Sequence, residues 1–117
     1  ASEVSSMECH GIGTPLGDAI ETGGLQAINR ERYTPLCLAA VKTNVGHVEC
    51  GAGSTGIVKC VMALRIGISL PTLHVHTINP HITGLASLPK LFNTESLAGD
   101  TMKSTGLSSF GFRGTNA

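Results

Sequence analysis

The sequence has few of the residues on which nucleic-acid recognition depends. Its 117 residues include no tryptophan, one tyrosine and three phenylalanines, and eight basic side chains are balanced by eight acidic ones. Proteins that bind nucleic acid usually present a basic stripe to the phosphates and aromatic rings to the bases. The sequence therefore predicts no nucleic-acid partner.

The chain also lacks a long apolar run. Its longest mostly apolar segment, Ile57 to Leu70, contains Lys59 and Arg65 and is shorter than the roughly 20 residues that a transmembrane helix needs. Residues Ala1 to Cys9 do not have the basic and then apolar regions of a signal peptide. We expect no membrane span and a cytoplasmic protein, with an organelle such as a plastid as the other intracellular location.

No pair of cysteines has the Cys-x-x-Cys spacing of a redox or zinc motif. The cysteines lie in apolar or glycine-rich surroundings that are typical of reduced, buried thiols, which indicates a reducing compartment. None has the strand-to-helix setting among small residues that is usual for an activated nucleophile. The four positions are Cys9, Cys37, Cys50 and Cys60.

Glycine, in contrast, is abundant, and its distribution is uneven. The fifteen glycines gather in four clusters, at residues 11–17, 23–24, 46–56 and 106–114. Such clusters mark positive φ angles or close backbone approach. A chain of this length supports one domain with a modest core. Because Ala1 stands just before a strand pattern and Ala117 inside a glycine-rich loop, we expect residues 1–117 to be one piece of a larger domain.

The first half of the chain shows two strand patterns, each followed by a polar turn and a helix. Residues 4–9 predict a strand that delivers His10 into a glycine-rich loop. Asp18 then predicts a helix N-cap, with Glu21 at the capping-box position. Residues 36–41 predict the second strand.

The turn after the second strand contains Lys42, Asn44 and His47, and a helix is predicted at Gly51 to Arg65. That helix is apolar on most sides, which is typical of a buried central helix. His47 is expected in a first helical turn, where partial positive charge favours neutral imidazole. Lys42 is close enough in sequence to position it.

The second half predicts an extended segment at residues 70–80, a helix end at Gly67, and strands at 87–92 and 105–110. Three glycine-rich loops then follow strands. If those strands form one sheet, the loops converge at its carboxyl edge. They would bring together His10, His47, Lys42 and the backbone around Phe110.

Four segments resemble motifs of the β-ketoacyl synthases. Residues 8–21, ECHGIGTPLGDAIE, resemble the histidine loop HGTGTPLGD, and residues 41–49, VKTNVGHVE, resemble VKSNxGHxE. Residues 70–74, LPTLH, resemble PPTLH, and residues 108–116, SSFGFRGTN, resemble SSFGFGGTN. The motifs occur in the family's order and span nearly the whole chain. They are most similar to ketosynthase domains of multifunctional polyketide and fatty acid synthases.

The resemblance implies an α/β, thiolase-like fold, built in the family from two related halves that assemble as homodimers. This chain would be a fragment of the C-terminal half, with a mixed sheet and a buried central helix. The N-terminal half, which carries the family's nucleophilic cysteine, would be missing, and the fragment alone would be inactive. No tightly bound cofactor and no metal is implied, because the substrates travel on the phosphopantetheine of an acyl carrier protein.

The resemblance also assigns roles. The family condenses an acyl thioester with a malonyl thioester that loses carbon dioxide. His10 and His47 would donate N–H groups to the enolate formed in that step. Lys42 would support the second histidine, and Phe110 would act as the gate, with its backbone N–H in the oxyanion hole. Thr14 would contact the pantetheine arm.

Some positions depart from the pattern or have structural interpretations. Ile12 stands where threonine is usual, so we expect one hydrogen bond to pantetheine, worth about 1 kcal/mol, to be absent. Arg113 replaces a small residue, which leaves open a degenerate, non-condensing domain. Near the site, we expect Asn44 to form a turn and Glu49 to make a salt bridge or a helix cap.

Two other classes of function remain open from the residues alone. The histidines of the 74–81 segment, with Cys9 beside His10, suggest a metal-binding module, but their spacing fits no strong zinc pattern. A non-enzymatic scaffold would need the glycine loops only for tight packing and would have no need of His10 and His47.

Overall fold

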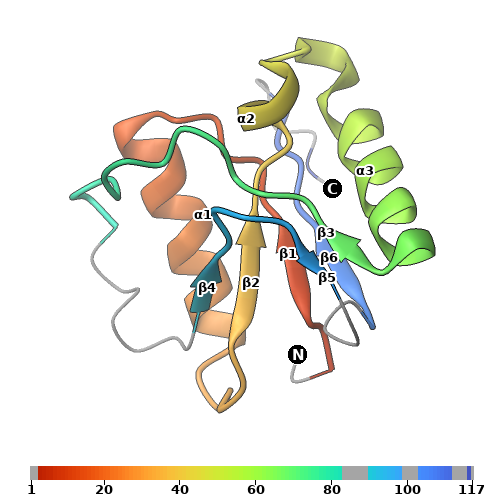
Figure 1. Ribbon diagram of the computed structural model, residues 1–117. Helices are drawn as coiled ribbons and strands as arrows, with labels where there is room; N and C mark the ends of the chain where they lie inside the picture. Colours follow the sequence, from red (N-terminus) through yellow and green to blue (C-terminus); the bar gives the residue numbers. More distant parts are fainter. Residues whose placement is uncertain (1–2, 83–89, 99–102, 112–115, 117) are drawn as a thin grey trace.

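The computed structural model describes residues 3–82, 90–98, 103–111 and 116. Four strands form a parallel sheet in the order β4-β2-β1-β6, and β3 pairs with β5 as a separate antiparallel ribbon (Figure 1). The elements are β1 Ser6–Glu8, α1 Pro15–Ile28, β2 Leu36–Ala39, α2 Lys42–Val45, the 3₁₀ turn η1 Glu49–Gly51, α3 Ala52–Ile66, β3 Ile68–Ser69, β4 Lys90–Phe92, β5 Leu97–Ala98 and β6 Thr105–Leu107.

The sheet separates α1 from α3 (Figure 1). On one face Met7 packs in a core cluster with Leu25 of α1. On the other face the next residue of β1, Glu8, forms an ion pair with Lys59 of α3. Successive side chains of a strand point to opposite faces, so the two helices lie on opposite sides of β1.

The central strand β2 explains why the sheet is parallel and covered on both faces. All four of its residues are buried, and Leu36 is only 1% exposed. A continuous apolar run is typical of a strand packed on both faces, whereas a half-exposed strand alternates. The mixed sheet that we expected is parallel in its four main strands, and antiparallel pairing in the described part of the chain is confined to β3–β5 and one bridge between Phe110 and Asn116.

Helix α1 begins earlier than the sequence predicted. Thr14 is its N-cap, with a hydroxyl that accepts the Gly17 N–H at 3.1 Å, and Pro15 occupies the first helical position. Proline is favoured there because its fixed φ suits a helix and its missing N–H would have no helical partner. The prediction of Asp18 as N-cap is therefore wrong. Its carboxylate accepts the Gly13 N–H at 3.0 Å from inside the first turn.

The placement of His47 in a first helical turn is also wrong. The short helix α2 ends at Gly46, whose φ is +79°, and α3 begins only at Ala52. His47 lies in the connection between them. A glycine in this conformation breaks the helix because other residues adopt positive φ only at a cost.

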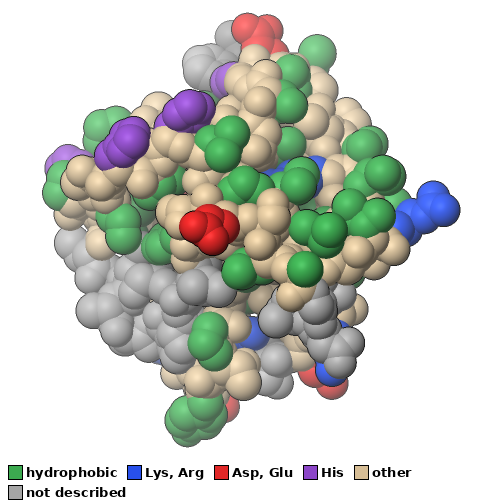
Figure 2. Space-filling view, in the orientation of Figure 1, with side chains coloured by type: hydrophobic (Ala, Val, Ile, Leu, Met, Phe, Trp, Pro, Cys, Tyr) green, Lys and Arg blue, Asp and Glu red, His purple; other side chains and the backbone are tan. Residues whose placement is uncertain are grey.

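Helix α3 has its predicted extent, to within a residue at each end, but it is not buried within this chain. Only its small residues Ala52, Gly56 and Ala63 are buried. A Cβ at Gly56 would lie 2.6 Å from Cδ1 of Leu107, so glycine is what allows the helix to pack closely on β6. Its larger apolar side chains are exposed, and Figure 2 shows apolar side chains gathered over this helix. The exposed ones are Ile57, Val58, Val61, Met62, Leu64 and Ile66.

The remaining predicted elements agree with the structure where it can be compared. Gly67 ends α3 in a left-handed conformation, with φ +65°. Strand β6 lies within the predicted 105–110 segment, and β4 lies within 87–92, of which residues 87–89 fall outside the described residues. No helix in the described part of the chain is long and apolar enough to cross a membrane.

We expect the isolated 117-residue chain to self-associate through the outer face of α3, because exposed apolar patches of this kind favour association. Replacing Ile57 and Val61, which are 54% and 49% exposed, by glutamine should lower the associated fraction in sedimentation velocity. Ser54→Gln, at an exposed polar position of the same helix, is the control and should leave it unchanged. A dilute monomer with a sharp, cooperative thermal transition would contradict this prediction.

Candidate active site

Three loops meet at the carboxyl edge of the parallel sheet, as the sequence predicted. Strand β1 lies between β2 and β6, with Glu8 opposite Ala39 on one side and Leu107 on the other. Parallel neighbours end at the same edge, so the loops that follow them lie next to each other. These loops carry His10, Lys42 and Phe110 respectively.

The imidazole of His10 is held by two donors on the same nitrogen. Nδ1 lies 3.3 Å from Nζ of Lys42 and 3.3 Å from the backbone N of Phe110. A lysine ammonium and a backbone N–H can only donate, so Nδ1 must carry a lone pair. The neutral ring then has its proton on Nε2, which is free to act as a donor.

The surroundings of His10 favour this neutral form. Burial lowers the pKa of His10 below its ordinary 6.5, and the charge of Lys42 lowers it further, whereas Glu21 and Asp18 act in the opposite direction. Burial also lowers the pKa of Lys42, against the carboxylates of Glu21 and Glu8. At His10 the folded protein binds fewer protons than the unfolded chain. The neutral His10 therefore contributes to the free energy of unfolding above about pH 6.5, and the contribution is lost as the pH falls below that value.

His47 has a matching hydrogen bond. Its Nδ1 accepts the backbone N–H of Glu49 at 3.2 Å, which again leaves Nε2 as the donor. The rings of His10 and His47 are 6.2 Å apart between centroids and nearly perpendicular. The site therefore contains two neighbouring imidazoles, each with its N–H donor at Nε2.

Lys42 supports a different histidine from the one expected. It was assigned to His47, but its Nζ contacts Nδ1 of His10 and donates to the His10 carbonyl at 2.5 Å. The reason is the sheet: Lys42 comes three residues after the end of β2, which lies beside the end of β1, whereas His47 lies beyond the turn at Gly46.

Glu21 is a residue of the site that the sequence reasoning missed. It is buried in α1, where its Oε1 accepts the His10 N–H at 2.6 Å and its Oε2 accepts the Gly11 N–H at 2.9 Å. The hydroxyl of Ser108 also donates to Oε1. Glu21 thus ties the histidine loop to the loop after β6. The only signal for this role in the sequence was the position of Glu21, about two turns into a helix that follows a glycine-rich loop, whose backbone N–H groups need acceptors.

Both histidines line one cavity of about 850 Å³. Ile12 and Thr14 form part of its wall, and Ile12 is 41% exposed. The hydroxyl oxygen of Thr14 accepts from Gly17, which leaves its proton available to a ligand. Cys50 is exposed in this wall, and Cys9 and Cys60 are half-buried, so the prediction of buried thiols holds fully only for Cys37.

The backbone N–H of Phe110 was expected in an oxyanion hole, and in this structure it donates to His10. The Phe110 ring lies 5.5 Å from the His10 ring and is 41% exposed at the cavity. Glu49, with φ +45°, also lines the cavity, and its main interaction in the site is its N–H on His47. Asn44 was expected to form a turn, but it lies in helix α2, and its side chain donates to the Pro71 carbonyl at 3.2 Å.

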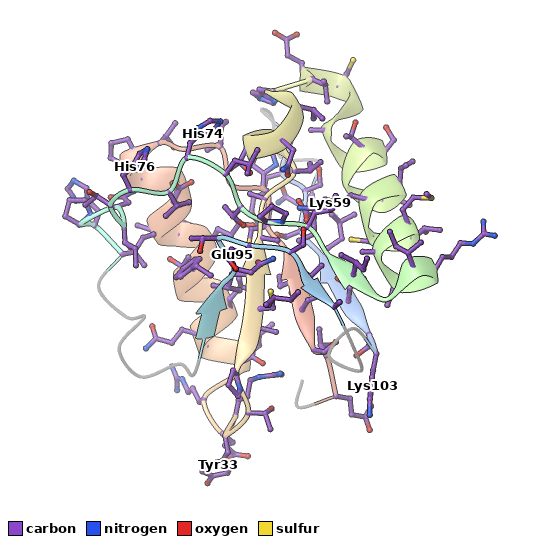
Figure 3. All side chains as sticks on the ribbon, viewed as in Figure 1. Tyr33, Lys59, His74, His76, Glu95 and Lys103 are labelled. Atoms are coloured by element: carbon purple, nitrogen blue, oxygen red, sulfur yellow. The ribbon has the colours of Figure 1, made fainter. Side chains whose placement is uncertain are left out.

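The histidines proposed for a metal site lie elsewhere. His74 and His76 are exposed on the segment after β3 (Figure 3). Among the described residues, no group of three or more histidine, cysteine or acidic side chains is arranged to hold a metal ion. Arg113 falls outside the described residues.

Known proteins are similar to this chain in both sequence and fold. Residues 1–76 match the family model for the β-ketoacyl synthase C-terminal domain. The chain is 42% identical over 120 residues to erythronolide synthase EryA2 of Saccharopolyspora erythraea, covering 100% of this chain and 3% of that synthase. It is also 44% identical over 123 residues to polyketide synthase GfsA of Streptomyces halstedii, covering 100% of this chain and 2% of that synthase.

Solved ketosynthase structures have the same fold. Ketosynthase twelve of the bacillaene polyketide synthase from Bacillus amyloliquefaciens superposes with a TM-score of 0.84 at 33% identity, over 97% of this chain and 21% of that chain. The oxazolomycin ketosynthase domain OzmH KS8 from Streptomyces albus JA3453 gives 0.87 at 29% identity, over 98% of this chain and 32% of that one. The thiolase-like fold that we expected is confirmed, and the chain spans a small part of each relative.

We expect Lys42→Met, in the full-length parent protein, to raise the pKa of His10. The substitution removes one of the two main causes of its depression and leaves burial in place. Hydrogen–deuterium exchange at the imidazole C2 position, followed by mass spectrometry against pH, measures each histidine separately. Lys103→Met, at the opposite end of the sheet (Figure 3), is the control. An unchanged His10 titration in Lys42→Met would show that the ammonium does not act on this ring.

Proposed function

Since this chain belongs to the β-ketoacyl synthase family, whose C-terminal domain it matches, we propose that it supplies the two-histidine part of a condensing enzyme. The parent would join an acyl thioester to a malonyl thioester, with loss of carbon dioxide, in polyketide or fatty acid synthesis. Residues 1–117 would be the C-terminal portion of its ketosynthase domain.

One observation supports this proposal most directly. In both His10 and His47 the Nδ1 atom accepts a hydrogen bond, so two Nε2–H donors belong to one cavity. When a malonyl thioester loses carbon dioxide, negative charge develops on the thioester oxygen. Two positioned donors at that oxygen stabilise the enolate in the transition state, where the charge is larger than in the substrate.

The nucleophile would come from outside this chain. All four of its cysteines are free thiols. Burial raises the pKa of Cys9, Cys37 and Cys60, which disfavours the thiolate that attack requires. In the parent, a cysteine of the N-terminal half would accept the acyl chain, and the enolate formed beside His10 and His47 would attack that thioester.

The substrates would arrive on the phosphopantetheine arm of an acyl carrier protein. Thr14 offers a free hydroxyl proton at the wall of the cavity, and Ile12 beside it offers only apolar surface. The exposed face of α3 would pack against the missing half, and the parent would be a homodimer. The free thiols fit a reducing, intracellular compartment.

A degenerate ketosynthase that decarboxylates without condensing is the second candidate. The observation in its favour is the backbone N–H of Phe110, which is taken up by His10 and would have to be released to serve the acyl thioester. Measuring malonyl decarboxylation and condensation separately in the parent distinguishes the two functions.

We expect His10→Ala and His47→Ala each to abolish condensation in the full-length parent while leaving its fold intact. Losing one such donor typically costs ~2.7 to 4 kcal/mol of transition-state stabilisation. Product formation from acyl and malonyl carriers is the measurement, and His76→Ala, at an exposed histidine outside the cavity, should retain activity. If either site variant kept more than about a tenth of the wild-type rate, the two-donor assignment would be wrong.

We expect Ile12→Thr to lower the Michaelis constant for the acyl carrier several-fold. A new hydroxyl beside Thr14 would add one hydrogen bond to pantetheine, worth about 1 kcal/mol. Ile12→Val, which has nearly the same shape as threonine and no hydroxyl, is the matched control. Equal constants for the threonine and valine variants would mean that position 12 does not contact the arm.

A further inference from the structure

The proposed chemistry does not use the one charged side chain of β1, which is buried. Glu8 is 4% exposed, and it ends the strand two residues before His10. One carboxylate oxygen, Oε1, accepts the backbone N–H of Val41. The other, Oε2, pairs with Nζ of Lys59 at 2.8 Å, and that lysine side chain is 7% exposed.

A buried ion pair of this kind needs an explanation other than stability. The loss of hydration of two buried charges is large, and replacing such a pair by apolar side chains of similar volume is often neutral or stabilising. A charged pair can instead hold neighbouring segments in fixed positions, because its hydrogen bonds have defined directions. The contacts of Glu8 indicate which part of the protein it holds in position.

Glu8 contacts three segments that border the cavity or lead into it. Its backbone carbonyl accepts the N–H of Ser108, two residues before Phe110. Its side chain holds Val41, the residue immediately before Lys42, and it reaches Lys59 on α3 across the sheet face. The Glu8 carboxylate thus connects the segment after β2, at Val41, to helix α3, at Lys59.

We infer that Glu8 is a positioning residue: by holding the amide of Val41, it keeps the Lys42 ammonium on His10. Lys42 reaches His10 through two contacts, to Nδ1 at 3.3 Å and to the carbonyl at 2.5 Å. Val41 has a helical conformation and leads directly into α2. A displacement of its amide would therefore move Lys42 with it. The catalytic role of His10 in this inference rests on the proposed function. The contacts of Glu8 and Lys42 do not depend on it.

Two double substitutions separate positioning from a purely structural role. Glu8→Gln with Lys59→Met removes both charges and keeps a side-chain oxygen that can accept the Val41 N–H. Glu8→Leu with Lys59→Met removes the same charges and also that acceptor, at similar volume. Neither variant leaves an unpaired buried charge, which would by itself destabilise the protein.

The titration of His10 is a readout that a structural role would not change. The charged groups that act on its pKa are Lys42, Glu21, His47 and Asp18, and Glu8 is not among them. Glu8 does raise the pKa of Lys42, but both double variants lose that effect equally. A difference between the variants at His10 therefore reports the position of Lys42.

The experiment follows C2 exchange of His10 against pH in the full-length parent, together with condensation kinetics. In the leucine variant the pKa of His10 should rise and kcat should fall about 10- to 100-fold, as expected for a small misplacement of a catalytic group, with KM for the carrier little changed. In the glutamine variant both quantities should remain close to wild type. The same His10 titration in the two variants would overturn the inference.

A variant that retains the charge covers the case in which the leucine variant does not fold. Glu8→Asp shortens the side chain by one methylene, so the carboxylate can stay with Lys59 only by moving away from Val41, and the pKa of His10 should again rise. An unchanged pKa in Glu8→Asp would also overturn the inference. Failure of the proposed function would be recognised separately, as condensation that survives His10→Ala.

Discussion

A carboxylate that is removed from water has to find hydrogen-bond donors, and at the carboxyl edge of this sheet the donors are the loops that form the cavity. Glu21 takes the amides of His10 and Gly11 and the hydroxyl of Ser108. Glu8 takes the amide of Val41 and the ammonium of Lys59. Loops with so many glycines have little conformational preference of their own. Their hydrogen bonds to these two buried carboxylates help to hold them in place.

Hydrogen-bond donors from neighbouring residues also determine the chemistry of the imidazoles. His10 receives two hydrogen bonds at Nδ1, and His47 receives one at the same atom from its own loop. A ring that accepts at Nδ1 must present its proton at Nε2, so each tautomer is set by a neighbouring backbone or lysine donor. Burial and the adjacent ammonium both lower the pKa of His10. A neutral donor is suited to stabilising a developing enolate, because the stabilisation does not require a prior protonation step.

Much of this arrangement could be predicted from the sequence, but the ends of some elements and several contacts could not. The strands at β1, β2 and β6, the helix that Gly67 ends, and the convergence of three loops all followed from local patterns. The errors concern which residue ends or caps an element: a proline moved the N-cap of α1 to Thr14, and Gly46 separated His47 from any helix. The sequence predicted a buried α3 because the helix is apolar on most sides, yet within this chain most of its large apolar side chains are exposed.

The sequence by itself indicated the four strands of the parallel sheet, the two long helices, the family and the two candidate histidines, since each of these depends on residues close together in the chain. Only the tertiary structure decided which side chain supports which ring. Lys42 lies five residues from His47 and 32 from His10, yet it contacts His10, because parallel pairing sets the ends of β1 and β2 side by side. The roles of Glu8 and Glu21 were likewise hidden. A buried carboxylate is defined by the donors around it, and some of those donors are far away in the sequence, such as Ser108 for Glu21 and Lys59 for Glu8.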